Sequence, residues 1–403
     1  MKRSLNRRGF LAGSGSLALL AGGFYVNPAR SADTRSPNEK LNLAFVGVAN
    51  KGWHNVQQLT SENVVALCDV DSDFLDKAAK SFPKAARYRD YRRLLDGSHQ
   101  EIDAVVVSTA DHSHAPATSI ALDLGKHTYC EKPLTHTVQE ARAISRLAAK
   151  RKVATQMGTQ IHASNNYRRV VETIAGGAIG PVAEVHCWCN KGWSGGKFES
   201  GQSAPANLDW DLWLGPAKER PYSPGIHPFN WRRFWDFGSG TLGDMGCHVL
   251  DLPFWALGLR HPETIRAEGP EPDAVGTPAW NKIEYRFAAQ GAQPAVRLLW
   301  SDGGKHSELV DETKAHDGKP LAKWGLGVLF VGERGMLAAD YGRLQLLPQD
   351  QFADFQPPQP TIADSVGHWN EWVAACKTSS PTSCNFDYAS ALTATVLLGT
   401  VAF

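Results

Sequence analysis

From residue 41 the chain alternates short apolar runs with longer segments in which apolar positions recur at helical spacing. A continuous apolar run bounded by turn residues is typical of a strand buried on both faces of a parallel sheet. Five such runs predict strands at 41–48, 63–70, 103–110, 127–133 and 152–159. The segments between them predict helices at 71–82, 114–125 and 137–151. We therefore expect an α/β fold, a doubly wound Rossmann-type parallel sheet, over residues 40–160.

Beyond about residue 180 the apolar runs are longer, partly alternating with polar residues, and joined by turns. They predict strands at 181–191, 282–290, 295–302, 327–335 and 342–348. Alternation favours an antiparallel sheet with one covered face. We expect residues 161–403 to form an α+β domain on a large, mostly antiparallel sheet. Two helix-like segments near the end, at 368–377 and 388–403, are expected to pack back on the first domain or on the sheet.

The first 32 residues predict a targeting segment outside the fold. A basic head with Arg7-Arg8, followed by Gly9 and Phe10, precedes an apolar stretch that is too short and glycine-rich for a stable membrane span. This order resembles the bacterial twin-arginine signal, whose route exports folded proteins to the periplasm. Small residues suggest cleavage near Ser31 or Ala32. A chance basic leader is the alternative.

Composition then narrows the class of protein. Hydrophobic residues make up 42% of the 403, charged residues 21%, and the formal net charge is +1. This describes a soluble globular protein with no field to attract nucleic acid. The seven cysteines are an odd number without metal-type Cys-x-x-Cys pairs. Cys376 and Cys384 could form a disulfide in an exported protein, and the sequence leaves their state open.

A glycine turn follows the first predicted strand. Gly47, Ala49 and Gly52 occupy the positions of a Gly-x-Gly-x-x-Gly fingerprint, with Asn50 and Lys51 between the last two. Such a turn lets backbone N–H groups at a helix N-terminus face a pyrophosphate. The middle position is normally glycine for close backbone approach, so Ala49 weakens the motif.

An acidic residue at the end of the second predicted strand strengthens the prediction of a dinucleotide site. Asp69 lies 22 residues after Gly47, where a carboxylate accepts hydrogen bonds from ribose hydroxyls and repels a 2′-phosphate. No arginine follows Asp69 directly, so NAD is favoured over NADP as the cofactor. The alternative for Asp69 is a helix N-cap, although Asp71 or Ser72 could fill that role.

Two further stretches carry a family resemblance. Asp111-His112-Ser113-His114 ends the third predicted strand, and Gly125-Lys126-His127 precedes Glu131-Lys132-Pro133 at the end of the fourth. These motifs resemble the Gfo/Idh/MocA oxidoreductases, named for glucose–fructose oxidoreductase and inositol dehydrogenase, over roughly residues 41–400. A final strand usual in that family is not evident before Phe403, which leaves open that the C-terminal end is missing.

A glycine-rich segment at 235–259 is similar to the family's Asp-x-x-x-His element, here Asp244 and His248. If the segment is helical, spacing i, i+4 puts both side chains on one face, one turn apart. The preceding residues 208–237, rich in tryptophan, resemble a branch of the family common among exported bacterial sequences.

The resemblance implies hydride transfer between NAD and a secondary alcohol, which requires a group to take the hydroxyl proton. It implies a catalytic or proton-relay role for Lys132, a base or hydroxyl ligand in His248, and a hydroxyl ligand or tuning group in Asp244. Glu131 is expected to orient the ribose or the lysine. Cofactor contacts are expected from Gly47, Ala49, Asn50, Lys51, Gly52, Asp69, Thr109, His112, His114, Glu131 and Lys132.

The substrate class implied is a sugar, glycoside or polyol, with homo-oligomers formed through the C-terminal sheet. Because free NAD is scarce outside the cytoplasm, we expect a tightly retained cofactor. A redox-neutral glycoside lyase or hydrolase is the alternative, and a degenerate sugar-binding protein a third. Asp244, Cys247, His248 and Asp251 lack zinc spacing, so no metal site is expected.

Overall fold

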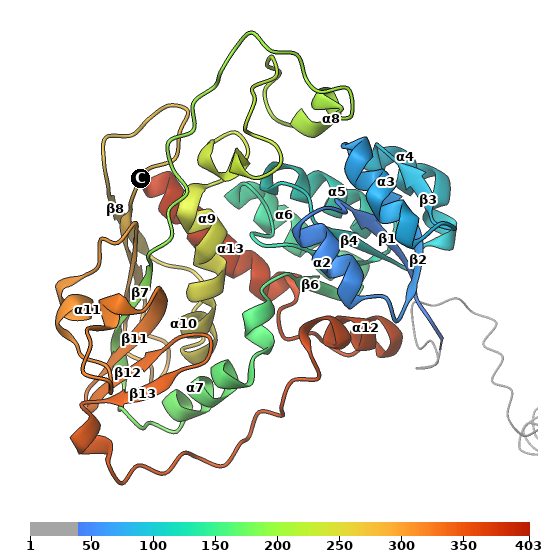
Figure 1. Cartoon of the computed structure of the whole chain (residues 1–403). Helices are drawn as coiled ribbons and strands as arrows, with labels where there is room; N and C mark the ends of the chain where they lie inside the picture. Colours follow the sequence, from blue (N-terminus) through green and yellow to red (C-terminus); the bar gives the residue numbers. More distant parts are fainter. Residues whose placement is uncertain (1–38) are drawn as a thin grey trace, which may run out of the picture. The chain divides into compact units, whose positions relative to one another are not determined.

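The computed structural model describes residues 39–403, so the predicted leader and its cleavage site lie outside the described residues. Two sheets organise the described chain. A six-stranded sheet belongs to the N-terminal domain and a seven-stranded sheet to the C-terminal domain (Figure 1).

The first sheet is parallel throughout, in the order β3-β2-β1-β4-β5-β6. This confirms the predicted Rossmann-type fold, since the strand order reverses beside β1 and opens a crevice at the carboxyl ends. Its strands are β1 (Asn42–Val46), β2 (Asn63–Cys68), β3 (Ala86–Tyr88), β4 (Ala104–Val107), β5 (His127–Cys130) and β6 (Thr155–Met157).

Helices cover both faces of this sheet. Along β1, Leu43 and Phe45 join one apolar cluster while Ala44 and Val46 join another, as expected for a strand buried on both sides. The covering helices are α2 (Lys51–Gln58), α3 (Ser72–Ser81), α4 (Tyr91–Ser98), α5 (His114–Asp123) and α6 (Val138–Arg151).

The second sheet runs β13-β12-β11-β7-β10-β9-β8 and is antiparallel except between β7 and β10. The predicted large, mostly antiparallel sheet is confirmed. Its strands are β7 (Val182–Cys189), β8 (Thr264–Glu268), β9 (Lys282–Phe287), β10 (Val296–Asp302), β11 (Leu326–Gly332), β12 (Gly335–Ala339) and β13 (Leu344–Leu347).

The expectation of only one covered face was too simple. The inner face packs on the main core, but a segment containing α11 (Glu308–Glu312) also covers part of the outer face. There Trp188 and Leu329 of the sheet contact a cluster that includes Val310 and Trp324. The outer face is therefore open only toward β8–β10, where charged side chains such as Arg297 lie.

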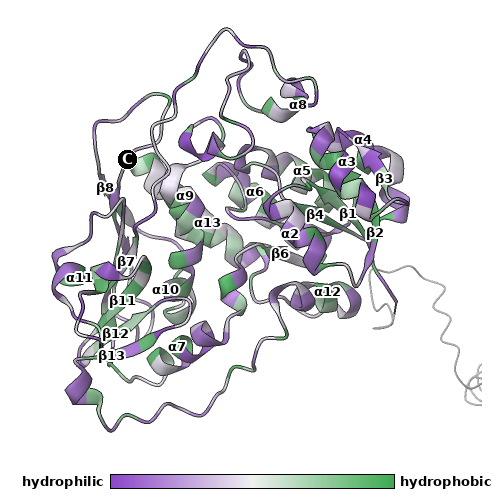
Figure 2. Cartoon of the chain, in the orientation of Figure 1, coloured by the Kyte–Doolittle hydropathy of each residue, from purple (hydrophilic) through white to green (hydrophobic). Residues whose placement is uncertain are grey.

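The predicted tail helices are present and pack as expected. They are α12 (His368–Thr378), against the first sheet, and α13 (Phe386–Ala402), against α6 and α9 (Gly240–Val249). The remaining helices are α7 (Asn165–Ala175), α8 (Trp210–Leu214) and α10 (Asp251–Ala256). In Figure 2 the ribbons of α9, α10 and α13 are coloured largely as hydrophobic or intermediate residues. No helix within residues 39–403 combines the length and apolar character that a membrane span requires.

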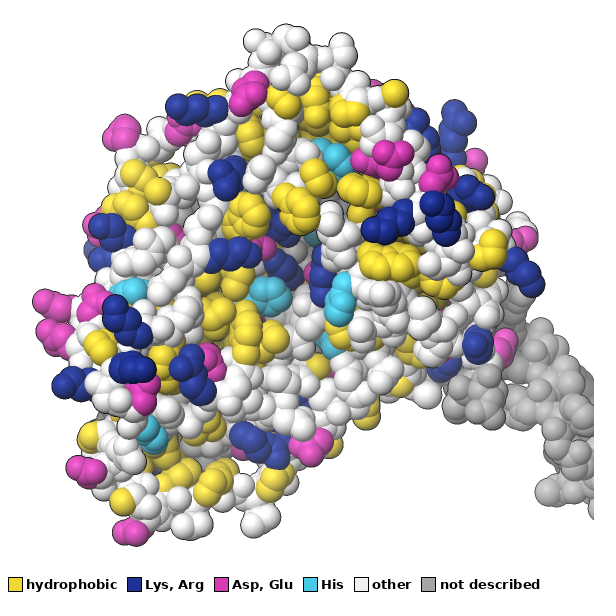
Figure 3. All heavy atoms as spheres, viewed as in Figure 1, with side chains coloured by type: hydrophobic (Ala, Val, Ile, Leu, Met, Phe, Trp, Pro, Cys, Tyr) yellow, Lys and Arg dark blue, Asp and Glu magenta, His cyan; other side chains and the backbone are white. Residues whose placement is uncertain are grey.

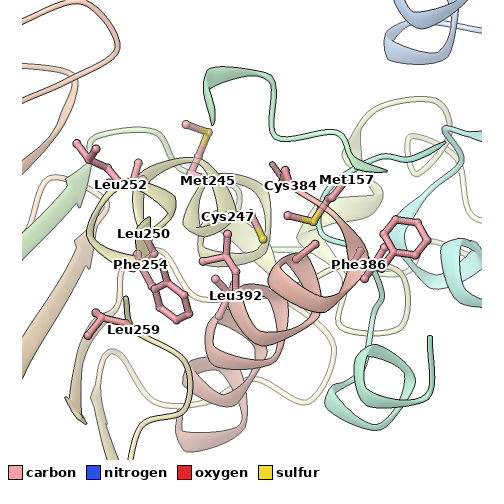
Figure 4. Close-up of a cluster of buried hydrophobic side chains, with 14 of the residues drawn as sticks. Met157, Met245, Cys247, Leu250, Leu252, Phe254, Leu259, Cys384, Phe386 and Leu392 are labelled. Atoms are coloured by element: carbon pink, nitrogen blue, oxygen red, sulfur yellow. The ribbon is translucent and has the colours of Figure 1, made fainter. Parts of the chain in front are cut away.

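One side chain of α13 ties several elements together. Thr393 is fully buried, and its hydroxyl accepts a hydrogen bond from the Leu134 N–H at 3.2 Å. The same oxygen lies 3.8 Å from the Cys247 sulfur of α9 and 3.5 Å from the Met157 sulfur of β6. Figure 4 shows Met157 and Cys247 together with Leu392 in this apolar cluster.

All seven cysteines are buried free thiols. Cys376 lies on α12, in the apolar cluster beneath the first sheet, and Cys384 lies in the main core. The disulfide that the sequence left open is absent.

Candidate active site

A cavity of about 540 Å³ lies at the carboxyl ends of the first sheet and is closed by residues of the C-terminal domain. Its size suits a small-molecule site. Every predicted site residue lines it except Gly52, which lies directly behind the glycine turn. Figure 3 shows Lys, Arg and His side chains gathered around a hollow in the middle of this face.

The glycine turn after β1 is tightly packed. Gly47 has a φ of +84°, and a Cβ there would lie 2.6 Å from the Ser108 carbonyl oxygen. A Cβ on Gly52 would collide with the Gly47 carbonyl oxygen. Asn50, with a φ of +50°, precedes α2, and Ala49 lines the cavity beside it. Both fingerprint glycines are thus required by the packing, and nothing in the structure explains the alanine between them.

Asp69 is fixed at the end of β2. Its two carboxylate oxygens accept hydrogen bonds from the N–H groups of Val48 at 2.9 Å and Asp71 at 3.0 Å. Asp71, not Asp69, caps α3, so the N-cap alternative for Asp69 fails. Burial raises the pKa of Asp69, although these two N–H groups oppose the shift. A glycine cradle with a held carboxylate at the neighbouring strand end fits the pyrophosphate and ribose of NAD.

Glu131 is anchored by several donors. Its Oε1 accepts hydrogen bonds from Asn55 at 2.9 Å, Gln160 at 3.1 Å and the Tyr129 hydroxyl at 3.2 Å. Lys51 approaches the same oxygen at 3.9 Å. This arrangement suits an orienting group rather than a reacting one. The sequence did not reveal its donors, since three separate elements bring them together.

The two histidines of η2 (Asp111–Ser113) and α5 line the cavity but are held by backbone carbonyls. His112 Nε2 lies 2.9 Å from the Trp213 carbonyl oxygen, and burial lowers its pKa to about 4. His114 lies between the carbonyl oxygens of Pro133 at 2.7 Å and Thr109 at 3.0 Å. Burial opposes a charge on His114, but Cys130, Asp111 and the Pro133 carbonyl raise its pKa to about 9. His112 is therefore neutral, and His114 braces the loop that carries Lys132.

Lys132 and Asp244 form the centre of the site. The Lys132 ammonium donates to the Asp244 side-chain oxygen Oδ1 at 2.7 Å and to its backbone carbonyl at 2.6 Å. Lys191 Nζ and Trp193 Nε1 donate to Oδ2 at 2.6 and 2.7 Å, and Arg232 Nε lies 3.0 Å from Oδ1. These contacts occupy both oxygens, so Asp244 fits the predicted tuning role and leaves little capacity for a substrate hydroxyl.

The charge state of Asp244 follows from its neighbours. Burial alone would raise the pKa of this carboxyl, but Lys132, Arg232 and Lys191 hold it well below its usual range. The group therefore stays ionised, and its low pKa makes it a weak base.

His248 follows Asp244 by one turn of α9, and the predicted helix is confirmed. Burial, reinforced by the Lys132 cation, lowers its pKa well below the usual value, so the imidazole is neutral. Its Nδ1 is buried without a hydrogen-bond partner in the described part of the chain. The ring packs edge-on against Tyr341, and its Nδ1 is left available to a ligand.

Lys191 and Trp193 were missed by sequence reasoning, and Arg232 was not among the predicted site residues. Lys191 and Trp193 follow β7, some fifty residues before Asp244, and no local motif marks them. Arg89 also lines the cavity, where its guanidinium donates to the carbonyl oxygens of Val70 and Asn207.

Within residues 39–403 no group of three or more His, Cys, Asp or Glu side chains is arranged to hold a metal ion. Asp251, which sequence spacing placed near His248, instead contacts His162 at 2.9 Å and the Tyr388 hydroxyl at 2.8 Å. Cys247 faces Thr393 in the core.

Two family models match the chain. Residues 41–159 match the NAD-binding Rossmann fold of the Gfo/Idh/MocA oxidoreductases. Residues 181–304 match the C-terminal alpha/beta domain of the same family, and the two matches together cover more than half of the chain.

Curated relatives match over a shorter stretch. A glycosyl hydrolase family 109 protein of Shewanella baltica is 26% identical over 206 residues, 44% of each chain. An alpha-N-acetylgalactosaminidase of Shewanella oneidensis is 28% identical over 193 residues, 41% of each chain. The chain thus spans less than half the length of these relatives.

Solved structures share the fold across nearly the whole chain. GenD2 from gentamicin A biosynthesis, in complex with NAD, has a TM-score of 0.60 at 19% identity, covering 94% of this chain and 96% of that one. The WlbA dehydrogenase of Bordetella pertussis, with NADH and UDP-GlcNAcA, has a TM-score of 0.60 at 15% identity, with 90% and 95% covered. Levoglucosan dehydrogenase with NADH has a TM-score of 0.59 at 17% identity, with 90% and 97% covered.

Proposed function

Because the chain belongs to the Gfo/Idh/MocA oxidoreductase family, we propose that it uses NAD to oxidise a secondary alcohol of a sugar, glycoside or polyol. The observation that carries this proposal is the Lys132–Asp244 pair beside His248, in one cavity with the glycine turn and Asp69. Bound NAD would supply a hydride acceptor. The turn at 47–52 would hold its pyrophosphate and Asp69 its ribose, in keeping with the family's cofactor.

The lysine is placed to act on the substrate oxygen. Two of the three N–H bonds of the Lys132 ammonium point to Asp244, which leaves one for a substrate hydroxyl. As hydride leaves the carbon, negative charge grows on that oxygen, and a fixed ammonium in a closed cavity stabilises it.

His248 supplies a proton acceptor. Its imidazole is neutral, one turn from Asp244, and lines the same cavity. In the proposed reaction the hydroxyl proton passes to the imidazole while Asp244 keeps Lys132 in position. A carboxylate that stays ionised is suited to this positioning role.

A direct test starts from the purified protein as it folds. Acid extraction should release NAD, and incubation with a panel of sugars, glycosides and polyols should produce NADH absorbance for at least one of them. A protein that contains no nicotinamide and binds no added NAD would refute the proposal.

A redox-neutral glycosidase or lyase is a second candidate, favoured by the relatives named as glycosyl hydrolase family 109 and alpha-N-acetylgalactosaminidase. Transient oxidation of a sugar hydroxyl would acidify the neighbouring C–H bond and permit elimination. The hydride would then return to the oxidised carbon, so that no net oxidation results. The two reactions separate in deuterated water. Release of the leaving group with deuterium on the sugar carbon and no net NADH would indicate the second candidate.

Export with the cofactor already bound is the proposed cellular context. It rests on the Arg7-Arg8 leader, which resembles a twin-arginine signal. Replacing both arginines by lysine should retain the protein in the cytoplasm, as measured by cell fractionation. Unchanged periplasmic recovery would contradict this route.

Homo-oligomerisation through the C-terminal sheet also remains a proposal. Because α11 and its flanking segment cover the outer face at β11–β13, only the part around β8–β10 is open to a second copy. There Arg297 lies between Glu184 and Glu284. Light scattering should report more than one copy, and Arg297→Glu should reduce that number; a monomer at all concentrations would refute it.

A further inference from the structure

The cavity wall that faces Lys132 carries an excess of positive charge. Lys132, Lys191 and Arg232 all lie within 3.0 Å of the same carboxylate, that of Asp244. One carboxylate against three cations leaves a net positive charge in a partly closed site, where the low dielectric strengthens its effect on a ligand.

The neighbouring acidic groups do not remove this excess. Glu131 lies on the cofactor side, where Lys51 approaches it, and Asp69 lies at the end of β2. Asp111 is 3.8 Å from Arg232 Nη2, but it is 1% exposed, does not line the cavity, and burial raises its pKa. Figure 3 shows the same imbalance, with Lys and Arg more prominent than Asp and Glu around the hollow.

Arg232 is held ready for a ligand. It lies on η4 (Asn230–Arg233), and its guanidinium carbon stacks 3.9 Å from the centre of the Trp231 ring. The side chain is only 20% exposed, yet it donates no hydrogen bond of normal geometry within residues 39–403, and its buried Nε has no such partner. A guanidinium fixed by stacking but lacking hydrogen bonds is suited to bidentate binding of an anion.

Lys191 provides a second cation on the same wall. Within residues 39–403 its ammonium makes one hydrogen bond, to Asp244, and the side chain is 46% exposed at the cavity. It lies 5.2 Å from the centre of the Trp193 ring, which limits its positions. An ammonium with unused N–H bonds beside a stacked guanidinium provides two kinds of donor for one anionic group.

We propose that the substrate is an anionic carbohydrate, a uronic acid or uronide, whose carboxylate binds Arg232 and Lys191 while the reacting hydroxyl lies at Lys132. This rests on the proposed function and names its substrate class. A sugar phosphate would also offer an anionic group to these two cations, but at a different position on the molecule. The planar guanidinium and the single adjacent ammonium favour a carboxylate of matching shape.

The test is a binding measurement on the NAD-loaded protein. Isothermal titration with methyl glucuronoside, methyl glucoside and glucose 6-phosphate compares a carboxylate, a neutral group and a phosphate on one sugar frame. We expect the glucuronoside to bind at least about tenfold more tightly than the glucoside, the lower range for a hydrogen bond to a charged group. Equal or tighter binding of the glucoside would overturn the proposal, and tighter binding of the phosphate would overturn the choice of a carboxylate.

Variants locate the effect. Arg232→Gln should weaken glucuronoside binding by roughly 10- to 100-fold and leave glucoside binding within a factor of about three. Arg232→Lys should restore part of the lost affinity for the glucuronoside. Lysine keeps the positive charge but lacks the planar pair of N–H donors that a guanidinium presents. Arg286→Gln, which removes an equal charge from an exposed site on β9, is the matched control and should bind as wild type. A thermal melt confirms that each variant is folded. An equal loss for both glycosides in Arg232→Gln would contradict the proposal.

Turnover separates this inference from the proposed reaction. Preferential binding of the glucuronoside without NADH formation would leave the anionic specificity standing and refute the oxidoreductase activity. NADH formation from the neutral glycoside, with no preference for the uronide, would support the oxidoreductase activity and refute the anionic specificity.

Discussion

The two walls of the cavity present polar groups by different means. The first wall, residues 46–52 with Asp69, depends on backbone N–H groups and on glycines that admit no Cβ. The second wall, formed by Lys191, Trp193, Arg232 and Asp244, depends on charged side chains from three separate segments. A backbone site tolerates most changes of side chain. A charge cluster does not, because removal of one member leaves the others uncompensated.

The largest expected effect is at the junction of the two walls. Lys132→Ala should lower kcat by about 10²- to 10³-fold, since one donor aimed at the developing negative charge contributes about that much. Bound NAD should remain, because the first wall is intact. Steady-state kinetics and nicotinamide extraction measure the two quantities. Lys319→Ala, an exposed lysine, is the control; a Lys132→Ala enzyme with wild-type kcat would remove the lysine from the mechanism.

Removal of the Asp244 carboxylate should strongly destabilise the second wall. Asp244→Ala should lower the free energy of unfolding by about 3–5 kcal/mol, because it strands buried cations. Asp76→Ala removes an exposed ion pair with Arg87 and should cost no more than about 1 kcal/mol. Urea unfolding measures both. Equal losses of unfolding free energy in the two variants would show that the charge cluster is no more sensitive than an exposed ion pair.

Acidification should remove the stabilising contribution of the Asp244 carboxylate without a mutation. The pKa of Asp244 is lower in the folded protein than its ordinary value of 3.8, so its contribution is complete above pH 3.8 and falls as pH drops below it. The stability difference between wild type and Asp244→Ala should therefore shrink below pH 3.8. Unfolding curves at several pH values measure it, and a difference that grew on acidification would show that the sign is wrong.

The first wall should respond to volume rather than charge. Gly52→Ala places a methyl against the Gly47 carbonyl oxygen and should destabilise the protein by about 1–3 kcal/mol, with loss of NAD. Gly97→Ala on α4, where a Cβ meets only the Tyr88 hydroxyl at 3.9 Å, is the matched control and should be neutral or slightly stabilising. If Gly52→Ala kept its NAD and stability, close packing of the turn would not be required.

The smallest expected effect is at the residue between the glycines. Ala49→Gly removes one methyl from the cavity lining and should strengthen NAD binding by less than about tenfold. Titration of NAD-free protein gives the dissociation constant. A larger gain would mean that Ala49 limits cofactor retention.

The contrast between the walls also explains what could be predicted from sequence. Gly47, Asp69 and the Glu131-Lys132-Pro133 element are local motifs at strand ends, and all lie where the pattern predicted. Lys191 and Trp193 carry no local signal, since their meaning comes from Asp244 about fifty residues away. Tertiary contacts of that kind have no signature in a single sequence.

The same reasoning holds for the fold. Most strands were predicted, whereas β3, β8 and β12 were missed. β3 has only three residues, and β8 is a short edge strand of five residues. β12 follows β11 after a two-residue turn, and its apolar run was not recognised as a separate strand. No predicted element covered the segment around α11, and only the structure shows that it packs on the sheet.

Thr393 gives the cavity a mechanical property. Its hydroxyl joins the loop after Lys132 to the helix that carries Asp244 and His248. Any hinge opening between the domains would have to pull these elements off α13 and expose apolar surface to water. We therefore expect molecules to enter and leave through movements of the loops at 190–237. The dwell time of a bound cofactor would then depend on those loops and could exceed many catalytic cycles.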